Sequence, residues 1–369
     1  MKICFVGPAS SVHLVKWCNW FAGRGHTVHV ISFTKGEIPT ADVHLIDTGV
    51  DPQGRALAKL KYMLTGKQMK RLIQEIRPDI INVHFATSYG IAMALSGIEG
   101  YILSVWGSDV YDFPKKSPLH KALLRFSLRK AAYLFSTSRA MADEAGRYTD
   151  KKFEITPFGV DMKLFHPNKR TGGEAERLSV LKKEDFVVGT VKALSDKYGI
   201  SYLLKAVAEV RKHTVIPIKL RIAGKGVQEE EYRQLAKTLG IDDITTWLGF
   251  ISQDEAAEEW ANMDVAIIPS TLDSESFGVS AVEAQACGTA VIISDVPGLM
   301  EATIPGKTAV VVKRKDVQGM AGAIIALYNN VEKRRAMGKS GRQFVRERFE
   351  LNDCFLSIEQ FYNRFKEKA

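Results

Sequence analysis

The sequence has few cysteines and lacks any long hydrophobic run. Four cysteines among 369 residues are too few for a disulfide scaffold, and their spacing does not pair them as metal ligands. No apolar stretch approaches the roughly 18–20 residues that a membrane-spanning helix needs. The apolar core of the first segment, Met1–Pro8, is also too short for a signal peptide. These absences predict a cytoplasmic protein.

Motifs of three other protein classes are also missing. The first loop, Gly7-Pro-Ala-Ser-Ser11, lacks the G-x-G-x-x-G spacing of NAD-binding proteins, which argues against a dehydrogenase. No acidic pair of the Asp-x-Asp kind offers a site for a divalent cation, so we expect no bound metal. No helix-turn-helix or aromatic stacking motif accompanies the basic residues, so nucleic-acid binding is a weak alternative.

Positive charge is concentrated in the first half of the chain. Residues 1–170 contain 24 Lys and Arg against 14 Asp and Glu, whereas residues 171–369 contain 27 against 28. Much of the excess lies in two segments, Lys59–Arg71 and Lys115–Lys130, in which apolar side chains separate the cations. Such segments can lie on an anionic membrane, although a core-facing helix with a solvated cationic face explains them equally well. The asymmetry favours an anionic partner for the first half: lipid head groups, a phosphorylated substrate or nucleic acid.

Short apolar segments alternate with helical segments along most of the chain, which predicts βαβ units and parallel sheets. The polar loop Asn168–Glu176 interrupts this alternation. We therefore predict an α/β fold with two doubly wound parallel-sheet domains, residues 1–168 and 169–349, and a ligand at the carboxyl ends of the strands. The predicted strands are Lys2–Val6, Thr27–Phe33, Asp79–His84, Tyr101–Val105, Tyr133–Ser136, Phe186–Val191, Ile218–Ile222, Thr245–Leu248, Val265–Pro269 and Ala290–Ser294.

The helical segments have weaker boundaries than the strands. Phe153–Pro167 shows no clear period, and we expect the chain after Ser294 to finish in helices. The predicted helices lie around Arg55–Ile76, Tyr89–Leu95, Leu119–Ala132, Tyr202–Lys212, Glu229–Leu239, Gln253–Asn262 and Ser280–Ala286.

The densest group of candidate site residues follows the strand that ends at Pro269. An acidic loop there contains Glu275 and leads through a glycine into a helix. Free amides and the helix dipole at such a helix start favour an anion such as phosphate. Glu283, about one turn further along, can accept hydrogen bonds from a ribose diol. Either glutamate alone is more simply a solvated surface carboxylate. The residues whose amides surround this helix start are Phe277, Gly278, Val279 and Ser280.

A second group is Lys192 and Lys197, directly after the strand that opens the second domain. Cations at a strand end suit a diphosphate, whose negative charge grows as it leaves. Considered without the rest of the sequence, they are more simply two exposed lysines on a loop.

These residues resemble a known family. The spacing from Glu275 to Glu283 resembles the E-x7-E signature of the family 4 retaining glycosyltransferases, which have the two-domain GT-B fold. The likeness extends over almost the whole chain. Gly224 lies in a stretch resembling the family's strand-end glycine turn, and Ile251 ends one resembling the approach to its base-binding loop.

The sequence departs from the family pattern beside the lysines. The family usually has Arg where this chain has Lys192. The change replaces a guanidinium group, which can donate two parallel hydrogen bonds, by the point charge of an ammonium group. It has glycine where this chain has Tyr198, and Gly199 follows one position later.

The first domain offers fewer candidates. Asp109 follows a predicted strand and can orient the donor sugar or the acceptor hydroxyl, although a helix N-cap is an equally good interpretation. Many members of the family have histidine where this chain has Trp106. His84 also ends a strand, where a structural histidine is as plausible as a catalytic one. Gly7 resembles a glycine that lets the backbone approach the ligand, but a lone Gly-Pro loop is a weak signal.

The resemblance implies a retaining, metal-independent transfer of a hexose or N-acetylhexosamine from a nucleoside-diphosphate sugar to a hydroxyl acceptor. Glu275 would hold sugar hydroxyls and Glu283 the ribose, while Lys192 and Lys197 would stabilise the leaving diphosphate. No cofactor is implied. A final helix, around residues 350–369, would pack back on the first domain.

We expect the acceptor to be a lipid-linked or cell-surface glycan precursor, with peripheral contact to the inner face of the membrane. The main alternative is a nucleotide-sugar 2-epimerase of related fold, which needs no acceptor. The sequence does not identify the sugar, the base or the acceptor.

Overall fold

The computed structural model describes residues 1–49, 58–169 and 185–367. These residues form two compact units. The first comprises Met1–Phe158 with Phe355–Ala369, and the second comprises Gly159–Cys354. Part of the predicted loop Asn168–Glu176, and the start of the predicted helix Arg55–Ile76, lie outside the described residues.

The first unit is built on a seven-stranded sheet in the order β3-β2-β1-β4-β5-β6-β7, with all neighbouring strands parallel. The central strands are buried along nearly their whole length, which suits their continuous apolar sequences. The strands are β1 (Lys2–Val6), β2 (Thr27–Ser32), β3 (Asp42–Leu45), β4 (Ile80–His84), β5 (Ile102–Val105), β6 (Tyr133–Ser136) and β7 (Phe153–Ile155).

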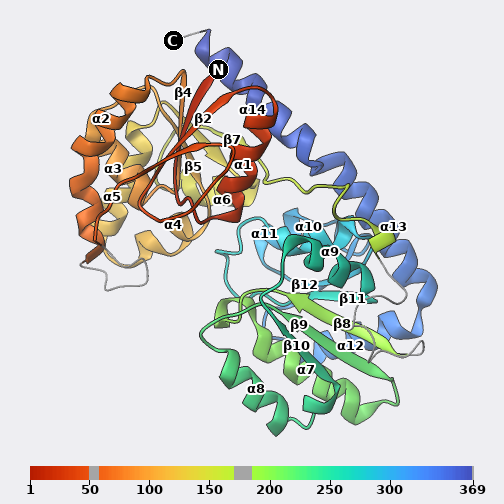
Figure 1. The fold of residues 1–369 in the computed structure, drawn as a ribbon. Helices are drawn as coiled ribbons and strands as arrows, with labels where there is room; N and C mark the ends of the chain where they lie inside the picture. The colour runs from red at the N-terminus through yellow and green to blue at the C-terminus, as the bar shows by residue number, and fades with distance from the viewer. Residues whose placement is uncertain (50–57, 170–184, 368–369) are drawn as a thin grey trace. The chain divides into compact units, whose positions relative to one another are not determined.

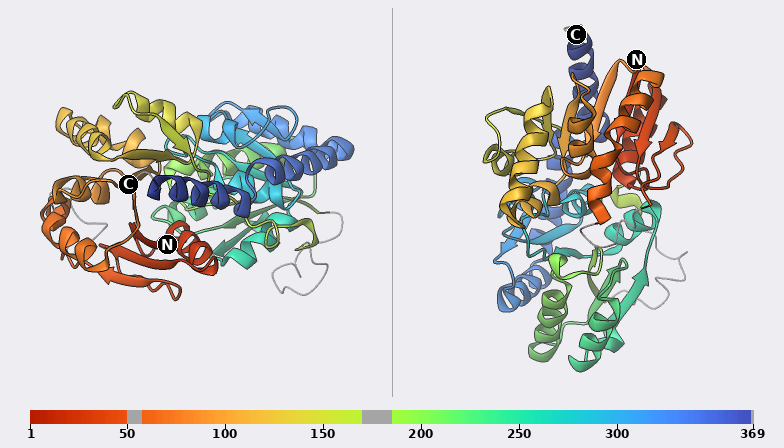
Figure 2. Two further views of the ribbon diagram at one scale, coloured as in Figure 1. Left: turned by 90° about the horizontal axis from the view of Figure 1, so that it is seen from above. Right: turned by 90° about the vertical axis from the view of Figure 1, so that its left-hand side faces the viewer.

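Helices cover both faces of this sheet (Figures 1 and 2). On one face α3 packs between α2 and α5. On the other, α1 meets the last helix, α14, through edge-to-face rings of Trp17 and Phe355 whose centroids lie 5.3 Å apart. The helices are α1 (Val12–Gly23), η1 (Ala58–Thr65), α2 (Gly66–Ile76), α3 (Ser88–Ser96), α4 (Ser108–Tyr111), η2 (Phe113–Lys115), α5 (Pro118–Lys130), α6 (Arg139–Gly146) and α14 (Leu351–Lys366).

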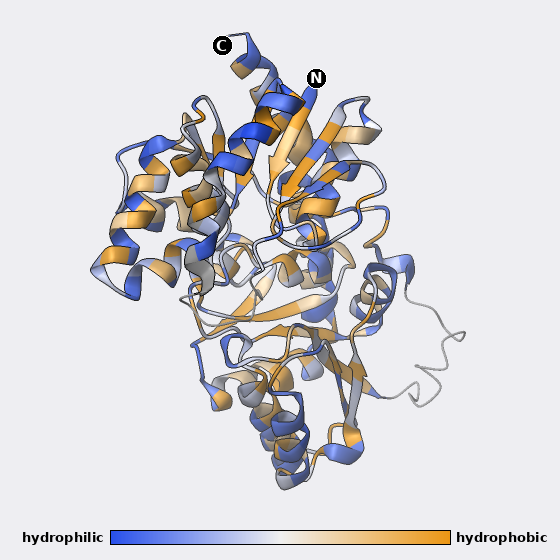
Figure 3. Cartoon of the chain, turned by 60° about the vertical axis from the view of Figure 1, so that its left-hand side comes forward, coloured by the Kyte–Doolittle hydropathy of each residue, from blue (hydrophilic) through white to orange (hydrophobic). Residues whose placement is uncertain are grey.

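The second unit has a six-stranded parallel sheet in the order β10-β9-β8-β11-β12-β13. Its core includes the fully buried Val188, Leu204 and Ile267, and hydrophobic residues follow the strands of both units in Figure 3. The strands are β8 (Phe186–Val191), β9 (Ile218–Ala223), β10 (Thr245–Gly249), β11 (Val265–Ile268), β12 (Ala290–Ser294) and β13 (Ala309–Val312).

The helices of the second unit also form two layers. α7 packs with α8 and α12, and α10 packs with α9 and α13. Ser252 and Glu255 form a reciprocal capping box that starts α9. The helices are η3 (Pro167–Lys169), η4 (Asp196–Tyr198), α7 (Ile200–His213), α8 (Glu229–Thr238), η5 (Asp242–Ile244), α9 (Gln253–Asn262), α10 (Val279–Ala286), α11 (Pro297–Glu301), α12 (Val317–Asn329) and α13 (Val331–Arg348).

Each sheet reverses its strand order once, between β1 and β4 in the first unit and between β8 and β11 in the second. In doubly wound folds the ligand binds at the carboxyl ends of the strands beside such a reversal. The loops after β8 and β11 contain Lys192, Lys197 and Glu275, so the predicted site residues of the second unit lie at this position.

The predicted α/β fold with two doubly wound parallel sheets is confirmed, but three strands were not predicted. They are β3, β7 and β13, and each lies at an edge of its sheet, whereas the fourth edge strand, β10, was predicted. β3 has no buried residue, and β7 has only three residues, none of them buried. β3 and β7 lack the continuous apolar run of a central strand, so their sequence signal is weak. β13, by contrast, is continuously apolar, so its sequence did carry the signal of a strand. The chain finishes in helices as expected, with α12, α13 and α14, although β13 precedes them.

Candidate functional site

The loop from β11 into α10 brings Glu275 and a helix start to the same end of the sheet. Glu275 is 7% exposed. Gly278 caps α10 with φ of 76°, a left-handed conformation that glycine adopts without steric cost. The amides that open a helix, here those of Val279 and Ser280, point out of its start and can bind an anion. Ser280 fixes this helix start to β8, because its hydroxyl donates to the Val191 carbonyl at 3.0 Å.

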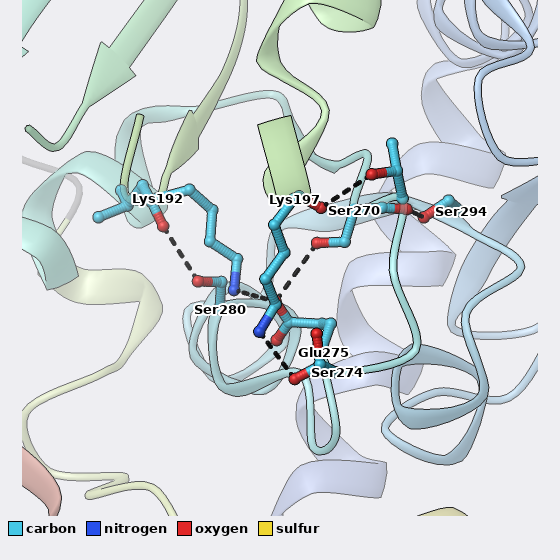
Figure 4. A network of polar contacts seen from close by, with 9 residues as sticks. Lys192, Lys197, Ser270, Ser274, Glu275, Ser280 and Ser294 are labelled. Atoms are coloured by element: carbon cyan, nitrogen blue, oxygen red, sulfur yellow. Dashed lines mark hydrogen bonds and ion pairs between the residues drawn. The ribbon is translucent and has the colours of Figure 1, made fainter. Parts of the chain in front are cut away.

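The side chains of Lys192, Lys197 and Glu275 converge (Figure 4). Lys192 Nζ lies 2.7 Å from Glu275 Oε2, and both side chains are about nine-tenths buried. Lys197 Nζ donates to the Ser274 carbonyl at 2.8 Å, in the residue just before Glu275. The Ser270 hydroxyl donates to the same Glu275 oxygen at 3.3 Å. The structure thus brings together both predicted lysines and the first predicted glutamate.

The electrostatics of this cluster keep Glu275 ionised. Burial alone would raise the pKa of its carboxyl, but the charge and hydrogen bond of Lys192, with a smaller contribution from Lys197, hold that pKa below its ordinary value. A carboxylate with two ammonium groups leaves one positive charge in excess. Together with the amides of α10, this excess favours a negatively charged group of a ligand.

The loops after β8, β9 and β10 are tied to one another beside the lysines. A Cβ atom at Gly224 would lie 1.8 Å from the Lys192 carbonyl oxygen, so only glycine permits this approach of the two backbones. The Gly224 amide donates to the Gly249 carbonyl at 2.7 Å, which joins the β9 loop to the end of β10. Ile251 follows two residues later and is 8% exposed. Gly224 and Ile251 therefore follow adjoining strands, β9 and β10.

Glu283 has a partner that the sequence did not indicate. The Trp260 indole on α9 donates to Glu283 Oε2 at 3.3 Å. Trp260 is fully buried and Glu283 is 7% exposed. In the sequence Trp260 is one apolar residue of an amphipathic helix, and nothing in its spacing points to Glu283. The contact depends on how α9 packs against α10.

In the first unit Asp109 organises two loops. Its carboxylate accepts hydrogen bonds from the amides of Ala86 at 2.8 Å, Gly107 at 2.8 Å and Trp106 at 3.2 Å. The side chain has no exposed surface. Burial raises the pKa of the Asp109 carboxyl, and the amide hydrogen bonds oppose that rise. These contacts join the loops after β4 and β5.

His84 lies among aromatic rings at the end of β4. Its ring centroid is 4.8 Å from that of Trp17 and 5.1 Å from that of Trp106. Burial lowers the pKa of His84 to about 3, so the imidazole is neutral near pH 7. Within the described part of the chain neither ring nitrogen has a hydrogen-bond partner. Gly7 adjoins this group, since a Cβ there would lie 3.2 Å from His84 Cβ.

Within residues 1–49, 58–169 and 185–367, no three His, Cys, Asp or Glu side chains gather in a way that could hold a metal ion. None of the helices described is long and apolar enough to span a membrane.

The two units match different family models. Residues 174–344 match the model "Glycosyl transferases group 1", and residues 2–138 match the model "Glycosyl transferase 4-like". Together these matches take in most of both parallel-sheet units. The chain therefore belongs to the group 1, or family 4-like, glycosyltransferases, and its two parallel-sheet units are those of the GT-B fold.

Individual relatives are similar in part or in whole. D-inositol 3-phosphate glycosyltransferase of Paenarthrobacter aurescens is 31% identical over 216 residues, which are 57% of this chain and 52% of that protein. The match to this relative thus spans about half its length. N-acetyl-alpha-D-glucosaminyl L-malate synthase of Bacillus anthracis is 24% identical over 366 residues, 92% of this chain and 90% of that protein.

A solved structure is similar over the whole fold. It is Anabaena Alr3699/HepE in complex with UDP, with a TM-score of 0.78 and 18% identity, covering 99% of this chain and 100% of that chain. At this identity the likeness supports the fold alone.

Proposed function

We propose that the chain transfers a hexose or N-acetylhexosamine from a nucleoside-diphosphate sugar to a hydroxyl acceptor, with retention of anomeric configuration. The observation that carries this proposal is the convergence of Lys192, Lys197 and Glu275 beside the start of α10. Cations and free amides suit a diphosphate, and a buried carboxylate suits the hydroxyls of a sugar. UDP, the ligand named for the HepE structure of the same fold, belongs to the class of diphosphate that we propose here.

In the proposed reaction the bond between the anomeric carbon and the diphosphate oxygen breaks, and a bond from that carbon to the acceptor oxygen forms. The acceptor proton passes to the departing diphosphate. Lys192, Lys197 and the amides of α10 stabilise the charge that develops on the leaving group. Glu275 holds sugar hydroxyls, and Glu283 holds the ribose. No step uses a cofactor or a metal.

Residues of the first unit have supporting roles in this proposal. Asp109 acts as a positioning residue, because its oxygens accept hydrogen bonds from the backbone amides that shape the loops after β4 and β5. Gly7 lets the loop after β1 lie against His84. These loops lie at the carboxyl ends of the strands, where doubly wound units bind their ligands. In this proposal the ligand of the first unit is the acceptor.

The test begins with binding of UDP, GDP and ADP, measured by calorimetry. The preferred diphosphate then selects the sugar donors for a transfer assay with and without EDTA. We expect one diphosphate to bind, its sugar derivative to be consumed only when an acceptor is present, and activity to persist in EDTA. Formation of an epimerised nucleotide sugar without acceptor would favour the 2-epimerase instead. Loss of activity in EDTA with rescue by Mn²⁺ would contradict the metal-independent reaction.

For the acceptor we propose a lipid-linked or cell-surface glycan precursor, reached by reversible docking of the first unit on anionic membrane. Six cations are exposed on η2, on α5 and in the short link between them, and Leu119 among them is 64% exposed. They are Lys115, Lys116, Lys121, Arg125, Arg129 and Lys130.

A small soluble anion is the second candidate acceptor. The names of two relatives, which specify D-inositol 3-phosphate and L-malate, favour it. A vesicle-binding experiment separates the two candidates, because a soluble acceptor requires no affinity for anionic lipid.

A further inference from the structure

Tyr198 stands between the two lysines of the site. Its ring centroid lies 4.7 Å from Lys192 Nζ and 5.2 Å from Lys197 Nζ, within the range of a cation–π contact for both. We propose that Tyr198 is a positioning residue that holds both ammonium groups ready for a nucleoside diphosphate. This inference rests on the proposed function of the same site.

The backbone around Tyr198 fixes where the ring can lie. The residue ends the short helix η4, and its amide donates to the Ser195 carbonyl at 3.0 Å. The preceding carbonyl, of Lys197, accepts from the Thr271 amide at 2.8 Å and from the Thr271 hydroxyl at 3.2 Å. The η4 turn is therefore tied to the loop after β11 that carries Glu275.

An aromatic ring suits this role better than a second carboxylate. The negative face of a ring attracts an ammonium group without changing the net charge of the site. An acidic partner in its place would repel the phosphates. Burial raises the pKa of the Tyr198 hydroxyl, so the side chain is neutral near pH 7. The lysines thus gain a partner that does not compete with the diphosphate.

The ring matters most for Lys192, whose ammonium group is also paired with Glu275. In the proposed function Glu275 turns to sugar hydroxyls when the donor binds, which weakens its hold on that ammonium group. Lysine has a flexible four-carbon stem, so an unheld ammonium group samples many positions. Tyr198 limits those positions at the moment when the diphosphate needs the charge.

The chain contains a matched pair outside the site. The Tyr202 ring on α7 lies 5.7 Å from Lys205 Nζ, and Tyr202 is half-buried against the core, as Tyr198 is half-buried in the site. Replacing each tyrosine by leucine therefore distinguishes the general effect of losing a tyrosine from the specific effect of losing the contact between Tyr198 and the lysines of the site.

Calorimetry on the wild type with UDP, GDP and ADP first identifies the diphosphate that binds best. The affinity for that diphosphate is then measured for Tyr198→Phe, Tyr198→Leu and Tyr202→Leu. Loss of a desolvated cation–π contact predicts about tenfold weaker binding for Tyr198→Leu. Tyr198→Phe keeps the ring face and should restore affinity to within about twofold of the wild type. Tyr202→Leu should bind as the wild type does. The matching nucleoside monophosphate should lose less affinity in Tyr198→Leu than the diphosphate does.

Three results would overturn the inference. Unchanged diphosphate affinity in Tyr198→Leu would show that the ring does not hold the lysines. Equal losses in Tyr198→Phe and Tyr198→Leu would assign the effect to the hydroxyl instead. Failure of the wild type to bind any of the diphosphates would overturn the proposed function, and this inference with it. Should thermal melting show that Tyr198→Leu does not fold, Tyr198→Met takes its place with the same expected loss.

Discussion

Trp260 donates its indole hydrogen to a carboxylate oxygen of Glu283 across 3.3 Å, from a position with no exposed surface. One oxygen of Glu283 is thereby directed by α9. The two glutamates of the site are therefore held in different ways. A buried indole orients Glu283, whereas an ammonium group pairs with Glu275.

The first prediction concerns this difference. Glu283→Ala should raise the donor KM and leave kcat nearly unchanged, because the ribose does not react. Glu275→Ala should lower kcat, since the reacting sugar changes shape and charge in the transition state. Trp260→Phe should raise the donor KM about fivefold, as expected for the loss of a hydrogen bond worth about 1 kcal/mol.

Steady-state kinetics with the identified donor check this prediction. Trp20→Phe, on α1 of the first unit, is the matched control and should leave both constants unchanged. Equal small effects of the two glutamate substitutions on both constants would contradict the proposed roles of Glu275 and Glu283.

The second prediction concerns Lys197. Lys197→Ala should lose at least about a hundredfold in kcat, the scale of removing one preorganised group that stabilises charge on a leaving group. The control is Lys205→Ala, which removes an exposed lysine on α7 and should keep wild-type turnover. Turnover near that of the wild type in Lys197→Ala would mean that the ammonium group does not act on the diphosphate.

The third prediction follows from the lowered pKa of Glu275. Because the folded-state pKa lies below the ordinary glutamate value of about 4.3, the charged pair stabilises the fold fully above that value. This contribution is lost as the pH falls through the lower folded-state pKa. The difference in unfolding free energy between the wild type and Glu275→Gln should therefore shrink as the pH falls below about 4. Chemical denaturation of both proteins between pH 3 and pH 7 measures this difference in unfolding free energy. A difference that grows toward acid pH would contradict the lowered pKa of Glu275.

The sequence predicted the central strands because each is a continuous apolar run between helical segments. It predicted Lys192, Lys197 and Glu275 because they follow strand ends on adjoining strands, where parallel topology collects side chains. The edge strands β3 and β7 were not predicted, since exposed and half-exposed residues carry little signal.

Contacts that depend on tertiary packing were also beyond the sequence. The Trp260–Glu283 hydrogen bond depends on how closely α9 and α10 pack. The position of the Tyr198 ring between two lysines depends on the path of the backbone through the η4 turn. Asp109 illustrates the same limit. Its position predicted either a cap or a ligand contact, whereas its three amide partners depend on how two loops meet.

The last prediction concerns the cations on η2, on α5 and in the short link between them. Each exposed Lys or Arg near an anionic surface contributes roughly 1 kcal/mol, so a handful of them gives weak, reversible binding. The exposed Leu119 beside them adds an apolar contact. We expect the wild type to sediment with vesicles as their anionic lipid content rises, and to dissociate as salt screens the charges. The test variant changes Lys115, Lys116, Lys121 and Arg125 to Ser.

This variant should lose most of the binding while keeping its melting temperature, because all four side chains are exposed. A matched control removes four exposed cations of α13 in the second unit, and it should bind as the wild type does; these are Lys333, Arg335, Lys339 and Arg346. Equal loss of vesicle binding in both variants would show that binding depends on the net charge of the protein and not on this surface. Absence of wild-type binding at low salt would instead remove the reason for a membrane-bound acceptor. A small anion, of the kind that the names of the relatives specify, would then be the better candidate.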